Sequence, residues 1–144
     1  MTRRVWLAAA AVASVGALAY LHEPPWTEAV TSGLRPWEED PPGTAFRWTF
    51  GRATFFAPAS AGSMTLPLRA VFPGAGGAPV TVDVRVDDRW LATIALPDPS
   101  AWVESTLPLG RRAGGRRYRR VDLRVSRVVP PFMLGVMTGR VTFR

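Results

Sequence analysis

The sequence has 144 residues, 47% of them hydrophobic, with 14 Pro, 13 Gly and no Cys. This length supports one hydrophobic core, and the lack of Cys excludes disulfides and Cys-based metal or redox sites. The formal net charge is +7, and all 18 basic residues are Arg. Lys, Asn and Gln are absent, a bias typical of GC-rich genomes, so the charge is in part a matter of composition.

Residues 1–22 predict a membrane-targeting segment. Arg3 and Arg4 precede seventeen uncharged residues, Val5 to Leu21, and about 17 residues is the lower limit for a helix that spans a bilayer. Ala17-Leu18-Ala19 is a small-x-small cleavage pattern. A cleaved signal peptide and a single transmembrane anchor therefore both stay open. In either case the body is extracytoplasmic, anchored or secreted.

Residues 23–44 predict a linker or an irregular wrap, because five Pro and two Gly interrupt any periodicity. Trp26 and Trp37 are unusual in a free linker. We therefore expect part of this segment to lie against the domain or in the membrane interface.

Residues 45–144 predict a β-sandwich domain. Short apolar runs begin with Ala45 to Phe50, Arg52 to Phe56 and Met64 to Phe72, each bounded by Gly, Pro or Ser. Pro67 has no N–H to donate to a ladder, so the third run is expected at a sheet edge or with one side open.

Pro79 to Leu96 predicts a central β-hairpin. Val80, Val82, Val84 and Val86 alternate with polar residues and share one face of a strand. We favour a two-residue turn at Asp87-Asp88, which places Trp90 opposite Arg85 on the outer face and requires a bulge near Thr93. A three-residue turn would instead bury Trp90.

Later runs complete the domain. Trp102 to Leu109, Val121 to Val125 and Gly139 to Arg144 read as strands, with a crossing loop at Val128 to Gly135. About eight strands with this spacing predict an all-β, antiparallel, jelly-roll-like sandwich behind one N-terminal apolar helix.

These runs carry a family resemblance. The order FRWTFGRATFFAP, VTVDVRVDDRWLATIAL, a Trp-led strand ending in LPL, and VDLRVSRVVPPFMLGV resembles galactose-binding-like jelly-roll modules of bacterial exported and membrane proteins. It is similar in particular to small domains that accompany lipid-linked-sugar glycosyltransferases. The likeness covers Leu34 to Arg144. It implies a β-sandwich and possible glycan contact, and it assigns no catalytic residue.

Two Arg–Trp pairs are candidates for ligand binding: Arg47 with Trp48, and Arg85 with Trp90. A sugar face stacks on an aromatic ring while charged groups bond its hydroxyls. The alternatives are a core tryptophan at position 48 and a surface cation–π pair at Arg85 and Trp90.

A basic loop is the strongest charged feature. It contains Arg111, Arg112, Arg116, Arg117, Arg119 and Arg120. Clustered Arg suits anionic headgroups or phosphorylated glycans, so we consider contact with an anionic surface; the alternative is a solvated loop tip. Nucleic acid is not an expected partner of an exported chain.

Enzyme activity is not predicted. The single His lies at position 22, beside the apolar segment, and no nucleophile has a base nearby in the pattern. We expect no cofactor and no metal, because Glu38-Glu39-Asp40 and Asp87-Asp88 lack the spacing of a Ca²⁺ loop. The sequence predicts a membrane-associated binding module that contacts a glycan or a glycosyltransferase. The alternative is a structural accessory domain that packs on a membrane protein. The sequence does not indicate the oligomeric state.

Overall fold

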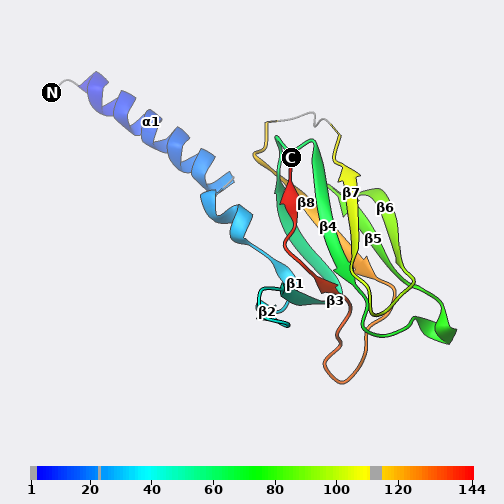
Figure 1. The fold of residues 1–144 in the computed structure, drawn as a ribbon. Coiled ribbons are helices and arrows are strands. Elements are labelled where there is room, and N and C mark those ends of the chain that lie inside the picture. The colour runs from blue at the N-terminus through cyan, green and yellow to red at the C-terminus, as the bar shows by residue number, and fades with distance from the viewer. Residues whose placement is uncertain (1–2, 23, 111–114) are drawn as a thin grey trace.

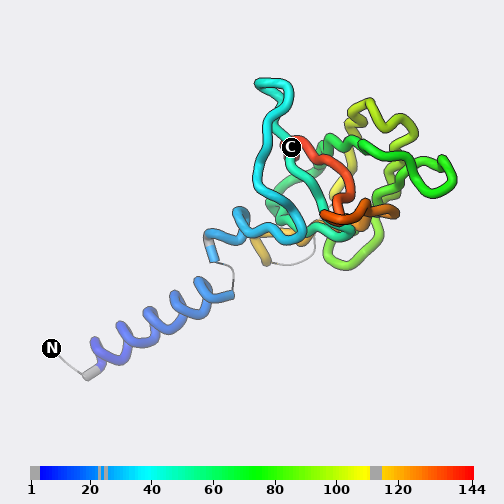
Figure 2. Tube along the Cα trace, turned by 90° about the horizontal axis from the view of Figure 1, so that it is seen from below, coloured from blue at the N-terminus to red at the C-terminus, as the bar shows by residue number. Residues whose placement is uncertain are grey.

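A computed structural model describes residues 3–22, 24–110 and 115–144 of the chain. Helix α1, Arg3–His22, projects away from the rest of the molecule in two perpendicular views (Figures 1 and 2). Its side chains from Arg4 to His22 are all exposed. The helix is apolar and long enough to cross a membrane, and a signal sequence fits the same description, so both interpretations of this segment stand.

The remainder is antiparallel β structure, as predicted. Ten strands and two short 3-10 helices lie in the described part of the chain: η1 Pro25–Ala29, β1 Ser32–Leu34, β2 Glu38–Glu39, β3 Ala45–Pro58, β4 Ser63–Arg69, η2 Ala75–Gly77, β5 Val80–Val86, β6 Arg89–Leu96, β7 Val103–Pro108, β8 Tyr118–Val125, β9 Met137–Thr138 and β10 Thr142–Phe143.

The long strand β3 belongs to both layers of a sandwich. Its second half, Arg52 to Pro58, pairs with β8, and the order continues through β5 to β6. Its first half pairs with β9, β9 pairs with β4, and β4 pairs with β7 on its other side. The sequence suggested two strands separated at Gly51; the structure instead has one strand that passes from one sheet to the other (Figure 1).

The core lies between the two sheets. Val82, Val84, Val121 and Leu123 from one sheet are fully buried together with Met64, Leu66 and Leu68 from the other. Their period of two along each strand puts the apolar side chains inside and leaves the alternate positions on the outer surfaces. Core packing therefore fixes which side chains the outer faces present.

The central hairpin has the favoured two-residue turn. Asp87 and Asp88 have φ angles of 50° and 66°, which matches the tight turn type of such hairpins, and Arg85 lies opposite Trp90. The predicted bulge near Thr93 is confirmed: Val84 pairs with Ala92 and Arg85 with Trp90, so the extra residue is Leu91 of β6, two positions before Thr93. Because the extra residue enters there, Ile94 and Leu96 return to the core while Trp90 stays 63% exposed.

Two expectations about the neighbouring strands are corrected. The wrap contributes β1 and β2, which both pair with β3. Gly33 allows this pairing, because it has φ +67° and a Cβ there would lie 1.9 Å from the Arg52 carbonyl oxygen. The expected edge position of the strand with Pro67 is wrong: β4 is internal, between β7 and the β9–β10 segment. Strand β4 tolerates Pro67 because the β9–β10 segment on that side is not a continuous strand. It is interrupted at Gly139, which lies beside the proline ring.

Candidate functional site

The outward side chains of β3, β8, β5 and β6 form two rows across one sheet, which we call the outer platform. Strand register places Thr54, Asp122, Arg85 and Trp90 in the first row. The second row contains Arg52, Arg124, Asp83 and Thr93. With strands about 4.8 Å apart, each row is about 14 Å long. An aromatic ring at one edge therefore adjoins a strip of charged and hydroxyl groups.

Trp90 is oriented by a short hydrogen-bond relay. Its Nε1–H donates to Thr93 Oγ1 at 3.3 Å, and the Thr93 hydroxyl donates to Asp83 Oδ1 at 2.6 Å. All three atoms lie on the solvent side of the sheet. The relay restricts the indole without covering it, so the ring is exposed and positioned at the same time.

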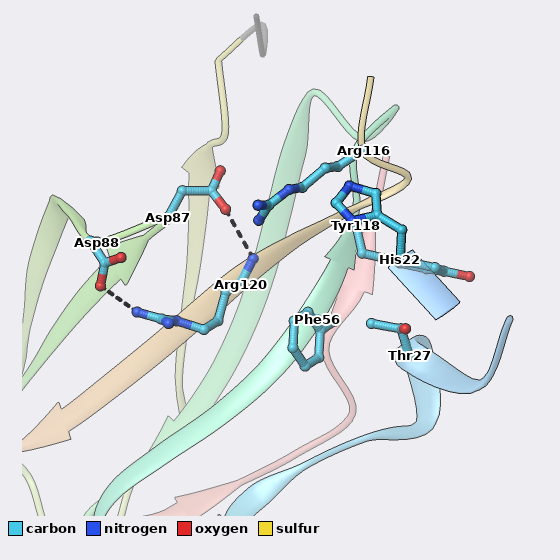
Figure 3. A pocket seen from close by; sticks show the side chains of 8 residues that line it. All are labelled: His22, Thr27, Phe56, Asp87, Asp88, Arg116, Tyr118 and Arg120. Atoms are coloured by element: carbon cyan, nitrogen blue, oxygen red, sulfur yellow. Dashed lines mark hydrogen bonds and ion pairs between the residues drawn. The ribbon is translucent and has the colours of Figure 1, made fainter. Parts of the chain in front are cut away.

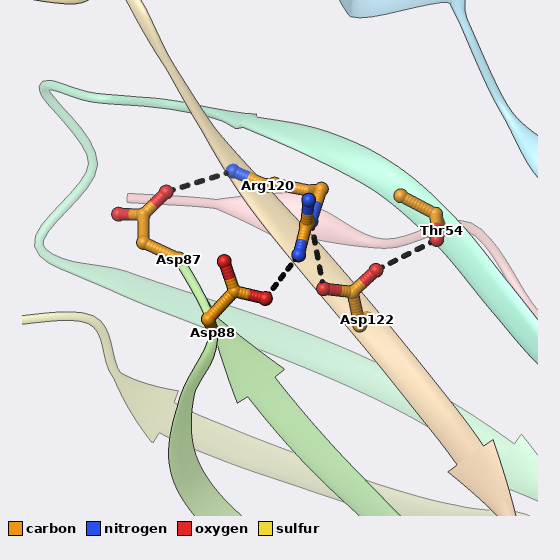
Figure 4. Close-up of polar contacts among 5 residues, drawn as sticks. All are labelled: Thr54, Asp87, Asp88, Arg120 and Asp122. Carbon is orange, nitrogen blue, oxygen red and sulfur yellow. Dashed lines mark hydrogen bonds and ion pairs between the residues drawn. The ribbon is translucent and has the colours of Figure 1, made fainter.

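A second polar cluster occupies the opposite end of the platform (Figure 4). The Asp122 carboxylate accepts from Thr54 Oγ1 at 2.7 Å and from Arg120 Nε at 2.9 Å, and Arg120 also pairs with Asp88. The hydrogen bond to Asp122 raises the pKa of the Arg120 guanidinium. These bonds join the hairpin turn, β8 and β3.

Three arginines of the platform have side chains that make no hydrogen bond or ion pair with any described residue: Arg52, Arg85 and Arg124. All three are exposed and line one open cavity of about 410 Å³, whose other walls include Thr54 and Asp122. Their donors are available to a ligand that lies along the rows.

The two predicted Arg–Trp pairs differ in the structure. Arg85 and Trp90 are exposed cross-strand neighbours on the platform. Trp48 is 8% exposed and packs edge-to-face with Phe46 at 6.4 Å, so it is a core residue. Arg47 points elsewhere, over the ring of Trp37 at 4.7 Å, and burial lowers the pKa of its guanidinium. The structure therefore does not bring Arg47 and Trp48 to one surface.

The arginines of the basic loop make different contacts. Arg111 and Arg112 lie outside the described residues. Arg119 binds Asp87 at 3.1 Å and also donates to the Leu109 and Gly110 carbonyls, so it ties the hairpin turn to the end of β7. Arg120 pairs with two carboxylates. Among the described residues of the loop, Arg116 and Arg117 are exposed, and the hypothesis of anionic-surface contact stays a prediction for them and for Arg111 and Arg112.

Arg116 lies close to the end of helix α1. It lines a cavity of about 620 Å³ together with His22, Phe56 and Tyr118 (Figure 3). The position is informative because a membrane crossed by α1 would have its surface near this end of the helix. Contact between Arg116, Arg117 and anionic headgroups stays a prediction.

Thr54, Thr93, Asp83 and Asp122 were not selected as site residues from the sequence. The signal that could have found them is the same alternation that identified the buried valines, since it also lists the outward positions. What the sequence lacked was the pairing of β3 with β8, which are 68 residues apart at Thr54 and Asp122.

No protein-family model and no curated protein sequence matches this chain. A family two carbohydrate esterase from Clostridium thermocellum, solved with cellohexaose, has a TM-score of 0.50 and 10% identity over 80% of this chain. This chain spans only 31% of that enzyme chain.

Smaller sugar-binding structures are also similar. The C-terminal domain of EclA, a sugar-binding protein, has a TM-score of 0.46 and 13% identity, covering 80% of this chain and 76% of its own. The C-terminal CBM6 of LamC from Zobellia galactanivorans has a TM-score of 0.47 and 10% identity, covering 78% and 88%. The fold is a jelly-roll β-sandwich. At these identities the likeness concerns the jelly-roll fold alone.

Proposed function

We propose that this protein is a non-catalytic glycan-binding module, held at a membrane by its N-terminal segment, and that the outer platform is its binding surface. The observation that carries the proposal is Trp90. Its indole is 63% exposed and is restricted by the relay through Thr93 to Asp83, so an aromatic face is presented to solvent in a fixed orientation.

The platform supplies the two interactions that saccharides need. The Trp90 indole offers an apolar face to the C–H side of a sugar ring. Arg85, directly opposite, offers donors to hydroxyl oxygens, and Arg52 and Arg124 extend these donors along the second row. With no Asn or Gln in the chain, Arg and Asp replace the amide groups that would otherwise bond hydroxyls.

The arrangement of carboxylates supports a binding role without catalysis. Asp122 already accepts from Thr54 and Arg120, and Asp83 accepts from Thr93. A glycosidase needs one carboxyl group that exchanges a proton with the leaving group across a cleft. Carboxylates engaged by donors on an open sheet are suited to orienting neighbours.

The test uses the full chain in polyoxyethylene detergent micelles, which contain neither sugar nor charge. A glycan array should give hits, and titration calorimetry of those glycans should show at least about fivefold weaker binding for Trp90→Ala, since a stacked aromatic contributes about 1 kcal/mol. Trp26→Ala removes another exposed tryptophan, 50% accessible against 63% for Trp90 and not part of the platform, and should bind as the wild type. An empty array, or equal binding by Trp90→Ala, would refute the proposal.

A second candidate function is an accessory domain that packs on a membrane protein. Phe132 and Met133 favour it, because they are 68% and 50% exposed beside each other in the loop before β9. A glycosyltransferase would be one such partner, a possibility that rests on the resemblance alone. An array without hits would favour this function over glycan binding.

A further inference from the structure

A second cavity lies away from the outer platform, where the segment before β3 packs on the sandwich. Its volume is about 460 Å³, and its lining includes Glu28, Trp37, Arg47, Phe56, Arg140 and Phe143. These residues come from η1, the chain before β2, β3 and the β9–β10 segment. Three stretches that are distant in sequence therefore converge on one site that the proposed function does not use.

Two guanidinium groups gather around one indole in this cavity. The Arg47 guanidinium lies 4.7 Å from the centre of the Trp37 ring, and that of Arg140 lies 5.8 Å from it. The ring faces of an indole attract cations, so Trp37 brings together two charges that would otherwise repel each other. Trp37 itself is 47% exposed, which leaves the site open to solvent.

The Arg47 side chain has a buried donor without a partner. Its Nε has no hydrogen-bond acceptor among the described residues, although it is inaccessible to solvent. Buried donors in native proteins are satisfied in the large majority of cases, and the exceptions cluster where a ligand or water completes the bond. Burial also lowers the pKa of this guanidinium, a cost that an anion would offset.

The charge of the lining selects the ligand. Glu28 is the carboxylate of the cavity, against Arg47 and Arg140, so the site carries one net positive charge. Neither arginine forms an ion pair with a described carboxylate. Arg presents parallel N–H groups that fit the two oxygens of a carboxylate or a phosphodiester.

We propose that the Trp37 cavity is a second binding site, which takes a singly charged oxyanion. The guanidinium groups of Arg47 and Arg140 donate to the oxyanion, Trp37 positions both arginines, and Phe56 with Phe143 contacts the apolar part of the ligand. A carboxylate of a uronic sugar and a phosphodiester share this chemistry. The site goes beyond the proposed glycan platform and does not depend on it.

The test follows the Nε–H signal of Arg47 by nitrogen-edited NMR of the full chain in polyoxyethylene detergent micelles. The signal is assigned by its loss in Arg47→Gln. Sodium glucuronate and sodium dimethyl phosphate are the two probes, with glucose and sodium chloride as neutral and ionic-strength controls. We expect a saturable shift with at least one probe and none with either control.

Variants separate this site from the platform. Arg140→Gln, at an exposed position between two short strands, should weaken the response at least about tenfold, as the loss of a charge-assisted hydrogen bond does. Arg140→Lys, which keeps the charge, should retain part of it. Arg124→Gln, on the platform, should leave the response of the Arg47 signal unchanged. Trp90→Ala tests glycan binding by the platform and not this site.

The outcome also identifies the source of the anion. A response to glucuronate alone assigns an acidic saccharide, and a response to dimethyl phosphate alone assigns a phosphodiester. The proposal is overturned if neither probe gives a saturable shift. It is equally overturned if Arg140→Gln folds as the wild type, by its NMR spectrum, and responds as strongly.

Discussion

Individual residues show how far alternation alone can assign a site. The pattern was sufficient to place Arg85 and Trp90 opposite each other on the outer face, because the turn at Asp87 and Asp88 fixes the register within a few residues; their role as a site stays a prediction. It was insufficient for Trp48 and Arg47. The directions of these two side chains depend on where β3 crosses between the sheets. In addition, Trp37 contacts Arg47 from a segment that has no periodic pattern.

One residue-scale prediction concerns acid titration of Asp98. Hydrogen bonds from the Ser100 hydroxyl, at 2.6 Å, and from its backbone N–H, at 2.7 Å, lower the pKa of the Asp98 carboxyl. Stability from this group is therefore present above the unfolded-state pKa and is lost as the pH falls through the lowered folded-state value.

Ser100→Ala removes the larger cause and should raise the pKa of Asp98, as measured by carboxyl carbon NMR titration. Ser100→Thr keeps the hydroxyl and should leave the pKa low. A titration curve that is the same in Ser100→Ala and the wild type would contradict the assignment of this hydrogen bond.

Among the elements, strand positions were easier to predict than strand partners. The hairpin could be predicted because its strands are adjacent in sequence. The internal position of β4 could not be predicted, since it depends on β9 and β10, which lie about seventy residues further along the chain. These two short strands both pair with β4, and the gap between them lies beside Pro67. Loop closure over such distances leaves no local sequence signal.

The hairpin turn supports an element-scale prediction. Asp87 and Asp88 both have positive φ, so replacing either by Ala adds a similar backbone cost. Asp87 in addition binds Arg119, whose side chain is 11% exposed, and accepts from the Arg120 backbone N–H at 3.1 Å. The Asp88 side chain is 78% exposed, so its pair with Arg120 contributes little.

We therefore expect Asp87→Ala to lower the free energy of unfolding by about 1–2 kcal/mol more than Asp88→Ala does, because only the first leaves a largely buried guanidinium without its carboxylate. Urea unfolding followed by tryptophan fluorescence measures both. Equal losses would show that the Arg119 contact contributes nothing beyond the turn.

For the whole molecule, two faces of one β-sandwich present different chemistry. The outer platform carries an oriented indole and three arginines whose side chains have no partner among the residues that the structure describes. The Trp37 cavity carries two arginines around one ring. The N-terminal helix projects away from the sandwich (Figure 2). The fold class followed from the sequence, whereas the separation of two sites required the sheet order.

The central claim is that Trp90 on the outer platform contacts a glycan. The six tryptophans of the chain give separate indole N–H signals in a nitrogen-edited spectrum, and Trp90→Phe identifies the one of interest. On titration with a glycan selected by the array, the account predicts a saturable shift of the Trp90 signal while that of buried Trp48 stays in place. Saturation that shifts other tryptophans and leaves Trp90 unchanged would contradict it.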